Sequence, residues 1–268
     1  VVSETNKTYG NSIQNISGSG TLTGITTGVG SDNIYQNTIN NLTSTGSPSN
    51  TIVSGINVTA GTVKNIYQNT ISNLVNNTFT VSTSGASLRG ILISGGTTVN
   101  AYQNKIFGVS SSSNTSGTIS GLWVTGGSTV SLDRNKIYDI SSSSSLMTAA
   151  IYGIQVSGST TTNSLITNIS NNVIGDLRVS AASNVDAIRG IGLISTGTTS
   201  THNVYYNTIY LNAAASSGTN SGSSGIYHTA NSTATTAVLD LRNNIIINNS
   251  VPKGSGTTVA FRRSSGSA

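Results

Sequence analysis

Apolar residues recur along this chain in short alternating runs that are separated by turn-forming residues. Segments such as NIYQNTINNL (33–42), NIYQNTISNL (65–74) and NVYYNTIYLN (203–212) have the same layout. Alternation with a period of two is typical of short, half-buried β-strands, and no stretch has the apolar spacing of a helix. The pattern therefore predicts an all-β fold.

A central asparagine marks each copy of this unit, and an isoleucine stands two residues after it every time. The marker asparagines, 26 to 37 residues apart, are Asn11, Asn37, Asn69, Asn104, Asn135, Asn172, Asn207 and Asn244. The isoleucines are Ile13, Ile39, Ile71, Ile106, Ile137, Ile174, Ile209 and Ile246. A repeat of this length indicates a solenoid built from stacked supersecondary units.

A second motif follows each asparagine unit and begins with glycine and an aliphatic residue. It reads GINV at Gly55, GILI at Gly90 and GLWV at Gly121. Each repeat thus offers three short strands, and one repeat alone cannot bury its isoleucine face. We expect a single domain over 1–268, a parallel β-helix of about eight coils with three short strands per coil. At about 4.8 Å per coil, it would form a rod roughly 40 Å long.

Stacked coils bring like residues together in columns. The asparagines are expected to occupy turns with positive φ and to hydrogen-bond to one another from coil to coil. A tyrosine column stands two residues earlier, at Tyr9, Tyr35, Tyr67 and Tyr102. The stretches of variable length between the asparagine and glycine units, such as 180–187 and 213–224, are predicted to be loops along one edge of the rod.

Composition narrows the possible partners. Only 7% of residues are charged, and Lys plus Arg number 12 against 7 Asp plus Glu. The positive charges are scattered, with Arg262 and Arg263 the one adjacent pair, so no footprint for nucleic acid is present. The chain has no cysteine and no apolar run of 18 residues, so the sequence predicts neither disulfides nor membrane insertion.

With these columns in place, the chain resembles the pectin-lyase-like right-handed parallel β-helix repeats. Segment 203–250 is especially similar to the Asn-Ile-Tyr-x-Asn-Thr-Ile repeats of large secreted surface proteins of Bacteroidetes-type bacteria. The resemblance covers residues 9 to about 263. It implies an extracellular location on a bacterial cell surface. It also implies that the chain is a fragment or processed part of a longer protein.

The resemblance raises the possibility of a polysaccharide lyase or hydrolase, which needs clustered carboxylates and a basic residue. Asp139 and Asp176 fall in one column, four residues after Asn135 and Asn172, with Arg178 nearby. They are the candidate catalytic residues, and the two carboxylates are the candidate Ca²⁺ ligands. The alternative interpretation is a surface cluster of neutralised charges, which we favour; no cofactor is then required.

Aromatic and basic side chains give weaker signals. Trp123 and Tyr227 would offer a sugar-stacking surface if their strand faces outward. His202 and His228 do not share a repeat position and are expected at the surface or at strand ends. Arg89 and Arg189 each precede the glycine of the Gly-Ile motif, which suggests a structural role at a coil corner.

The sequence therefore favours a non-catalytic structural or adhesive module. Such a module would serve as a stalk, surface layer or matrix filament that contacts glycans or further copies of itself by end-to-end stacking. A polysaccharide-cleaving enzyme and a carbohydrate-binding module are the alternatives. Activity on acidic polysaccharides that Asp176→Asn abolishes would favour the enzyme.

Overall fold

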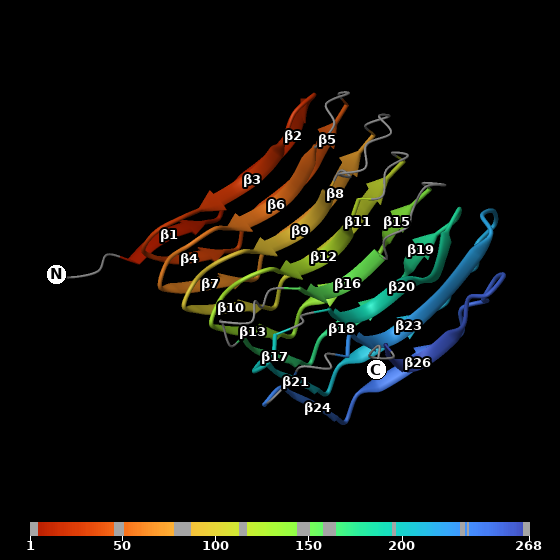
Figure 1. Ribbon diagram of the computed structural model, residues 1–268. Helices are drawn as coiled ribbons and strands as arrows, with labels where there is room; N and C mark the ends of the chain where they lie inside the picture. The colour runs from red at the N-terminus through yellow and green to blue at the C-terminus, as the bar shows by residue number, and fades with distance from the viewer. Residues whose placement is uncertain are drawn as a thin grey trace.

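The computed structural model describes residues 5–45, 51–77, 87–112, 117–143, 151–157, 165–194, 197–230, 234 and 236–264. All regular secondary structure in these residues is β-strand, arranged in three parallel sheets. Figure 1 shows the strands stacked side by side, with the chain advancing along the stack from the first rung to the last. The predicted all-β parallel solenoid with three strands per coil is confirmed.

Each rung of the solenoid supplies one strand position to each sheet, and the three sheets are named A, B and C in that order along a rung. Sheet A consists of β1 (Thr5–Tyr9), β4 (Ser31–Tyr35), β7 (Val63–Tyr67), β10 (Thr98–Tyr102), β13 (Thr129–Asp133), β17 (Ile166–Ser170), β21 (Thr201–Tyr205) and β24 (Val238–Arg242). Sheet B consists of β2 (Ser12–Gly18), β5 (Thr38–Ser44), β8 (Thr70–Asn76), β11 (Lys105–Ser111), β14 (Lys136–Ile137), β15 (Ile140–Ser142), β18 (Val173–Gly175), β19 (Leu177–Val179), β22 (Thr208–Leu211) and β25 (Ile245–Asn248). Sheet C consists of β3 (Leu22–Thr27), β6 (Ile52–Val58), β9 (Ser87–Ile93), β12 (Ile119–Val124), β16 (Ile151–Val156), β20 (Ser183–Leu193), β23 (Asn220–His228) and β26 (Thr258–Arg263).

The isoleucine column forms the centre of the core. Ile39, Ile71, Ile106, Ile137 and Ile209 pair directly or through one neighbour in register along sheet B, and each is fully buried. Ile174 is 1% exposed, whereas Ile13 and Ile246 at the two ends of the column are partly buried. Inward-facing residues of sheets A and C complete one continuous cluster, so apolar burial is shared between rungs rather than contained within any of them.

The asparagine ladder lies at the corner between sheets A and B. Nδ2 of Asn104 donates to the carbonyl oxygen of Ile66 and to Oδ1 of Asn135, at 2.9 and 3.0 Å. Oδ1 of Asn104 accepts from the backbone N–H and the side-chain amide of Asn69, at 3.1 and 3.0 Å. Both ends of the buried amide are therefore satisfied, and only an amide of this length offers a donor and an acceptor in these directions.

The backbone conformation at this corner differs from the expectation. Positive φ occurs one residue before the marker asparagine, as at Gln36 (56°), Gln68 (55°), Gln103 (55°) and Tyr206 (56°). The ladder asparagines are absent from the positive-φ residues. The asparagine is thus required for its hydrogen bonds, while the residue before it makes the turn.

Some of the predicted loops are strands. Strand β20 begins at Ser183 and β23 at Asn220, so 183–187 and 220–224 extend sheet C instead of protruding from it. These two segments pair with each other across a register shift between Asn184 and Ile188. The variable segments at 46–50, 78–86, 113–116 and 144–150 lie outside the described residues. In the described part of the chain, no helix is long and apolar enough to span a membrane.

Candidate functional site

The candidate carboxylates Asp139 and Asp176 are brought together as the repeat spacing predicts. Both hydrogen-bond to the guanidinium of Arg178, which spans the two neighbouring rungs. All three side chains are well exposed, at 39% for Asp139, 49% for Asp176 and 48% for Arg178. The arrangement is a solvent-accessible ion-pair triad in which the one nearby guanidinium is already occupied by both carboxylates.

Backbone geometry explains why acidic residues stand at these two positions. Asp139 and Asp176 have φ of 55° and 51°, in the left-handed region that few residue types tolerate. The same column holds Asn15, Asn41, Asn73 and Gly108, and all of these also have positive φ. Asparagine, aspartate and glycine are the residue types suited to this conformation, so the carboxylates need no catalytic explanation.

The donor set at this triad also fits a divalent cation poorly. Calcium takes six to eight oxygen ligands, whereas Asp139 and Asp176 offer two exposed carboxylates that share an arginine. Among the described residues, no group of three or more His, Cys, Asp or Glu side chains could hold a metal ion. The described geometry gives no support to a calcium site here.

Trp123 and Tyr227 lie on the outer side of sheet C, in one column but not on adjacent rungs. Gln155 and Gly192 stand between them in the register. An arginine covers each ring: the Arg89 guanidinium carbon lies 4.4 Å from the Trp123 ring centroid, and that of Arg189 lies 3.6 Å from the Tyr227 centroid. The two rings therefore do not form a shared stacking surface.

Arg189 instead connects a polar cluster on this side of sheet C. Its Nε donates to Oδ2 of Asp186 at 2.9 Å, and its Nη1 donates to the hydroxyl of Tyr152 at 2.8 Å. Asp186 is 3% exposed and also accepts from Ser224 Oγ at 2.6 Å. These bonds join three successive rungs, although Arg189 lies within β20 and not at a coil corner, whereas the buried Nε of Arg89 donates no hydrogen bond.

The tyrosine column forms a stack on sheet A that ends abruptly. Tyr9, Tyr35, Tyr67 and Tyr102 lie face to face, with centroids 4.8 to 4.9 Å apart and planes within 3° of parallel. The next rung has Asp133 opposite Tyr102. A cavity of about 310 Å³ opens at this break, lined by Asn65, Asn100, Tyr102, Ser131, Asp133 and Arg134; we call it the tyrosine notch.

The tyrosine notch combines an aromatic face with polar groups. Tyr102 stacks on Tyr67 on one side only, and its other face looks toward the rung of Asp133. Burial raises the pKa of Asp133, but hydrogen bonds from Asn171, Arg134 and Ser170 outweigh it and hold the pKa below its usual value. The carboxyl group is therefore ionised at neutral pH and accepts hydrogen bonds.

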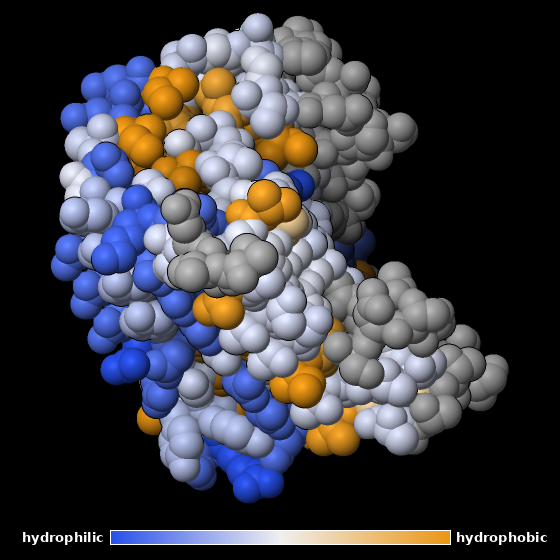
Figure 2. Space-filling view, turned by 90° about the vertical axis from the view of Figure 1, so that its left-hand side faces the viewer, coloured by the Kyte–Doolittle hydropathy of each residue, from blue (hydrophilic) through white to orange (hydrophobic). Residues whose placement is uncertain are grey.

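On the face of the molecule shown in Figure 2, hydrophobic side chains form separate patches among polar ones. The described residues on this face form no single large apolar area that would itself indicate a partner.

Three polar side chains of the interior were missed from the sequence. Lys64 is fully buried and forms an ion pair with Asp32, in a column where later rungs have Val99 and Val130. His202, expected at the surface or at a strand end, is the second residue of β21, but it is 3% exposed and belongs to this same inward-facing column. Aligning the repeats over sheet A as well as the asparagine unit would have placed all three on the inside.

Comparison with known proteins returns no relative from which a function could be transferred. No protein-family model matches the chain, and neither a curated protein nor a solved structure gives a significant match. The functional argument therefore depends on the residues and on their geometry.

Proposed function

We propose that this chain is a non-catalytic structural module, a stiff extracellular spacer of a bacterial cell surface or matrix. The observation that supports the proposal is the asparagine ladder, which runs from Asn11 to Asn244 and joins every rung to the next. Side-chain ladders of this kind add polar cohesion along the axis to the sharing of the apolar core.

The low charge of the chain supports the same proposal. Only 7% of residues are charged, and the polar surface consists largely of uncharged amides and hydroxyls. Outward columns also form ladders, for example Asn33 with Asn65 at 2.8 Å and Asn65 with Asn100 at 2.9 Å. Cohesion through uncharged groups changes little with salt concentration, which suits a protein exposed to a variable medium.

Force spectroscopy along the rod axis tests the spacer function. A chain that unravels rung by rung should lengthen by about 9–13 nm per event, because 26 to 37 residues extend at up to about 0.36 nm each. Unfolding at low force in a single step would contradict the proposal. An Asn135→Ala variant should lower the force of the event that involves its rung.

The arginine-bound carboxylates support the absence of catalysis in this proposal. Arg178 holds both Asp139 and Asp176, and the backbone conformation explains the type of residue at each position. A panel of acidic polysaccharides, assayed for unsaturated products at about 235 nm and for new reducing ends, provides the test. Cleavage that disappears in Asp176→Asn would establish a lyase or hydrolase instead.

The resemblance to secreted Bacteroidetes-type surface repeats motivates the proposed location. The parallel solenoid is compatible with the pectin-lyase-like group, and the chain would then be one part of a longer surface protein. End-to-end stacking of copies belongs to the same proposal, because an open sheet edge is a template for pairing with a further strand. Electron micrographs of the purified chain would show filaments if such stacking occurs and separate short rods if it does not.

Glycan contact at the tyrosine notch is a second candidate function. An open ring face beside hydrogen-bonding amide, hydroxyl and carboxylate groups matches a pyranose ring, which presents one apolar face and a rim of hydroxyls. This position replaces the pair Trp123 and Tyr227, whose rings are separated and covered by arginines. We place any sugar contact at the face of Tyr102.

A glycan array followed by titration calorimetry tests this contact. Tyr102→Ala should abolish binding of a responding glycan. Tyr35→Ala is the matched control, because Tyr35 is stacked on both faces within the same column. Equal losses in the two variants would mean that the notch has no special role, and the absence of any binder would leave the spacer as the proposed function.

A further inference from the structure

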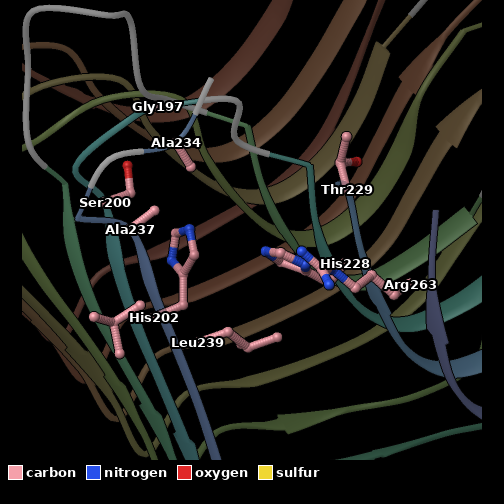
Figure 3. A pocket seen from close by; sticks show the side chains of 10 residues that line it. Gly197, Ser200, His202, His228, Thr229, Ala234, Ala237, Leu239 and Arg263 are labelled. Atoms are coloured by element: carbon pink, nitrogen blue, oxygen red, sulfur yellow. The ribbon is translucent and has the colours of Figure 1, made fainter. Parts of the chain in front are cut away.

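A cavity of about 310 Å³ lies inside the corner where sheet C returns to sheet A, near the last rungs. Ser200, His202, His228 and Arg263 line its polar side, and Ala237 and Leu239 line its apolar side. Figure 3 shows the two imidazoles projecting into this space from different strands, with Ala234, Ala237 and Leu239 beside them. The cavity thus has a polar wall and an aliphatic wall.

The polar wall is unusual because its groups lack partners. The described residues contain eight buried side-chain nitrogen or oxygen atoms without a hydrogen bond. Three of the eight line this cavity, namely Oγ of Ser200, Nδ1 of His202 and Nδ1 of His228, and a fourth, Oγ1 of Thr167, belongs to the residue paired with His202. Buried polar groups without a hydrogen bond are rare and destabilising, so their concentration here is what a binding site for a hydrogen-bonding ligand would require.

Packing does not require these imidazoles. The column of His202 contains Val99 and Val130 in other rungs, and the column of His228 contains Val156 and Leu193. Aliphatic residues fill the same corner completely there, with 0% exposure. Histidine at these two places therefore replaces a well-packed apolar corner with an open polar one.

The charges of the lining residues indicate the sign of the partner. Arg263 is the one formally charged side chain among the described lining residues. Burial lowers the pKa of His202 to about 4, with a further contribution from His228. The pKa of His228 is lowered by burial and by Arg263. Both rings are neutral at pH 7, so the cavity carries a net positive charge that repels cations and attracts anions.

We propose that this cavity binds a short-chain carboxylate. The planar guanidinium of Arg263 matches the carboxylate group, and the imidazoles together with the hydroxyls of Ser200 and Thr229 supply further hydrogen bonds. The alkyl end lies against Ala237 and Leu239. This site is independent of the spacer function proposed above, because it concerns the interior of the solenoid rather than its length or surface.

Titration calorimetry of the purified chain at pH 7 tests the proposal with three probes: propionate, its neutral analogue propionamide, and inorganic phosphate. Propionate should bind at least tenfold more tightly than propionamide, because the guanidinium recognises the charge. Phosphate should bind more weakly than propionate, since it has no alkyl end for the aliphatic wall. Equal binding of propionate and propionamide, or preference for phosphate, would overturn the assignment.

Two arginine variants locate the site. Arg263→Gln should weaken propionate binding at least tenfold. Arg262→Gln is the matched control on the same strand, because Arg262 bonds to Ser224 Oγ and the backbone carbonyl of Thr257 outside this cavity. If both variants bind propionate like the parent chain, the site lies elsewhere and the proposal fails.

A histidine variant separates binding from folding. His202→Val restores the residue type that the column has at Val99 and Val130, so the chain should fold and melt at a higher temperature than the parent. Its propionate response should be lost, because the apolar side chain closes the polar wall. Undiminished propionate binding by a folded His202→Val chain would contradict the proposed role of the imidazole.

Discussion

Gly55 in sheet C and Ile71 in sheet B of the next rung touch so closely that no side chain fits between them. A Cβ atom on Gly55 would lie 2.6 Å from Cγ2 of Ile71 and 2.6 Å from the carbonyl oxygen of Gly90. The same relationship links Gly90 to Ile106 and Gly190 to Ile209. The glycine motif and the asparagine-isoleucine motif are therefore two halves of a single contact.

This contact predicts the effect of one added methyl group. Gly55→Ala should destabilise the chain by about 1–3 kcal/mol, because both the backbone of the next rung and a core isoleucine must move. Chemical denaturation monitored by circular dichroism measures the change. Gly28→Ala is the control, since its Cβ would meet nothing nearer than Thr59 Oγ1 at 3.8 Å. Equal effects of the two substitutions would show that the contact is unimportant.

The repeats allowed the solenoid, its three strands per rung and the buried isoleucines to be predicted, because burial in a stacked fold follows directly from register. The sequence did not reveal that Asp139 and Asp176 stand where the backbone is left-handed, since a column of Asn, Asp and Gly has more than one explanation. It also did not place His202 inside, because a histidine between two polar-looking neighbours resembles a surface residue. Which groups lack partners depends on three-dimensional packing, which no pattern of residue types contains.

The asparagine ladder predicts a strong difference between an amide and an acid. Asn104→Asp removes both donor bonds of Nδ2 and places a carboxylate against Oδ1 of Asn135, in a position that is 1% exposed. We expect a loss of about 3–5 kcal/mol in the free energy of unfolding. Gln103→Glu, one residue earlier in an exposed ladder, should change it by less than about 1 kcal/mol. Comparable losses in urea titrations of both variants would argue against the ladder as a major source of stability.

The buried pair of Lys64 and Asp32 predicts a non-additive pair of substitutions. Lys64→Val should lower the free energy of unfolding by about 3–5 kcal/mol, because it leaves the Asp32 carboxylate buried without its ion-pair partner. The double variant Asp32→Val/Lys64→Val should have a free energy of unfolding within about 1 kcal/mol of that of the parent, since Val99 and Val130 occupy this column in later rungs. A double-mutant cycle from denaturation midpoints gives the coupling, and simple additivity would show that the ion pair is not coupled.

The triad of Asp139, Asp176 and Arg178 predicts tolerance of charge removal and intolerance of branched side chains. Asp176→Asn should alter stability by less than about 0.5 kcal/mol, because asparagine already adopts the same positive φ at Asn41 and Asn73. Asp176→Val should lower the free energy of unfolding by about 1–2 kcal/mol, since a β-branched residue is strained at positive φ. Added calcium should leave the melting temperature unchanged in the parent and in both variants. A calcium-dependent rise that only Asp176→Asn removes would establish a metal site.

Burial of His202 predicts that stability falls when the pH is lowered. The pKa of His202 is about 4 in the folded chain because desolvation disfavours the charged ring, with an ordinary value of 6.5 in the unfolded chain. Above pH 6.5 both states are neutral and no difference arises. Between pH 6.5 and about 4, His202 becomes protonated in the unfolded chain but stays neutral in the folded chain. This difference lowers the free energy of unfolding by up to about 3 kcal/mol. His228, which faces His202 from sheet C, lowers the pKa of His202 further, and Arg263 in the same cavity lowers the pKa of His228. Thr167 and Leu239, on either side of His202 in sheet A, do not ionise. Denaturation curves at pH 7 and pH 4.5 should therefore differ in the parent chain and differ much less in His202→Val. Asp32 does not account for a change in this pH range. Its pKa is lowered in the folded chain, because hydrogen bonds from Lys64, Thr27 and Asn6 outweigh the effect of burial, so the stability it contributes is lost only below its ordinary pKa of 3.8. An equal fall in stability of both proteins between pH 7 and pH 4.5 would assign the pH dependence to a group other than His202.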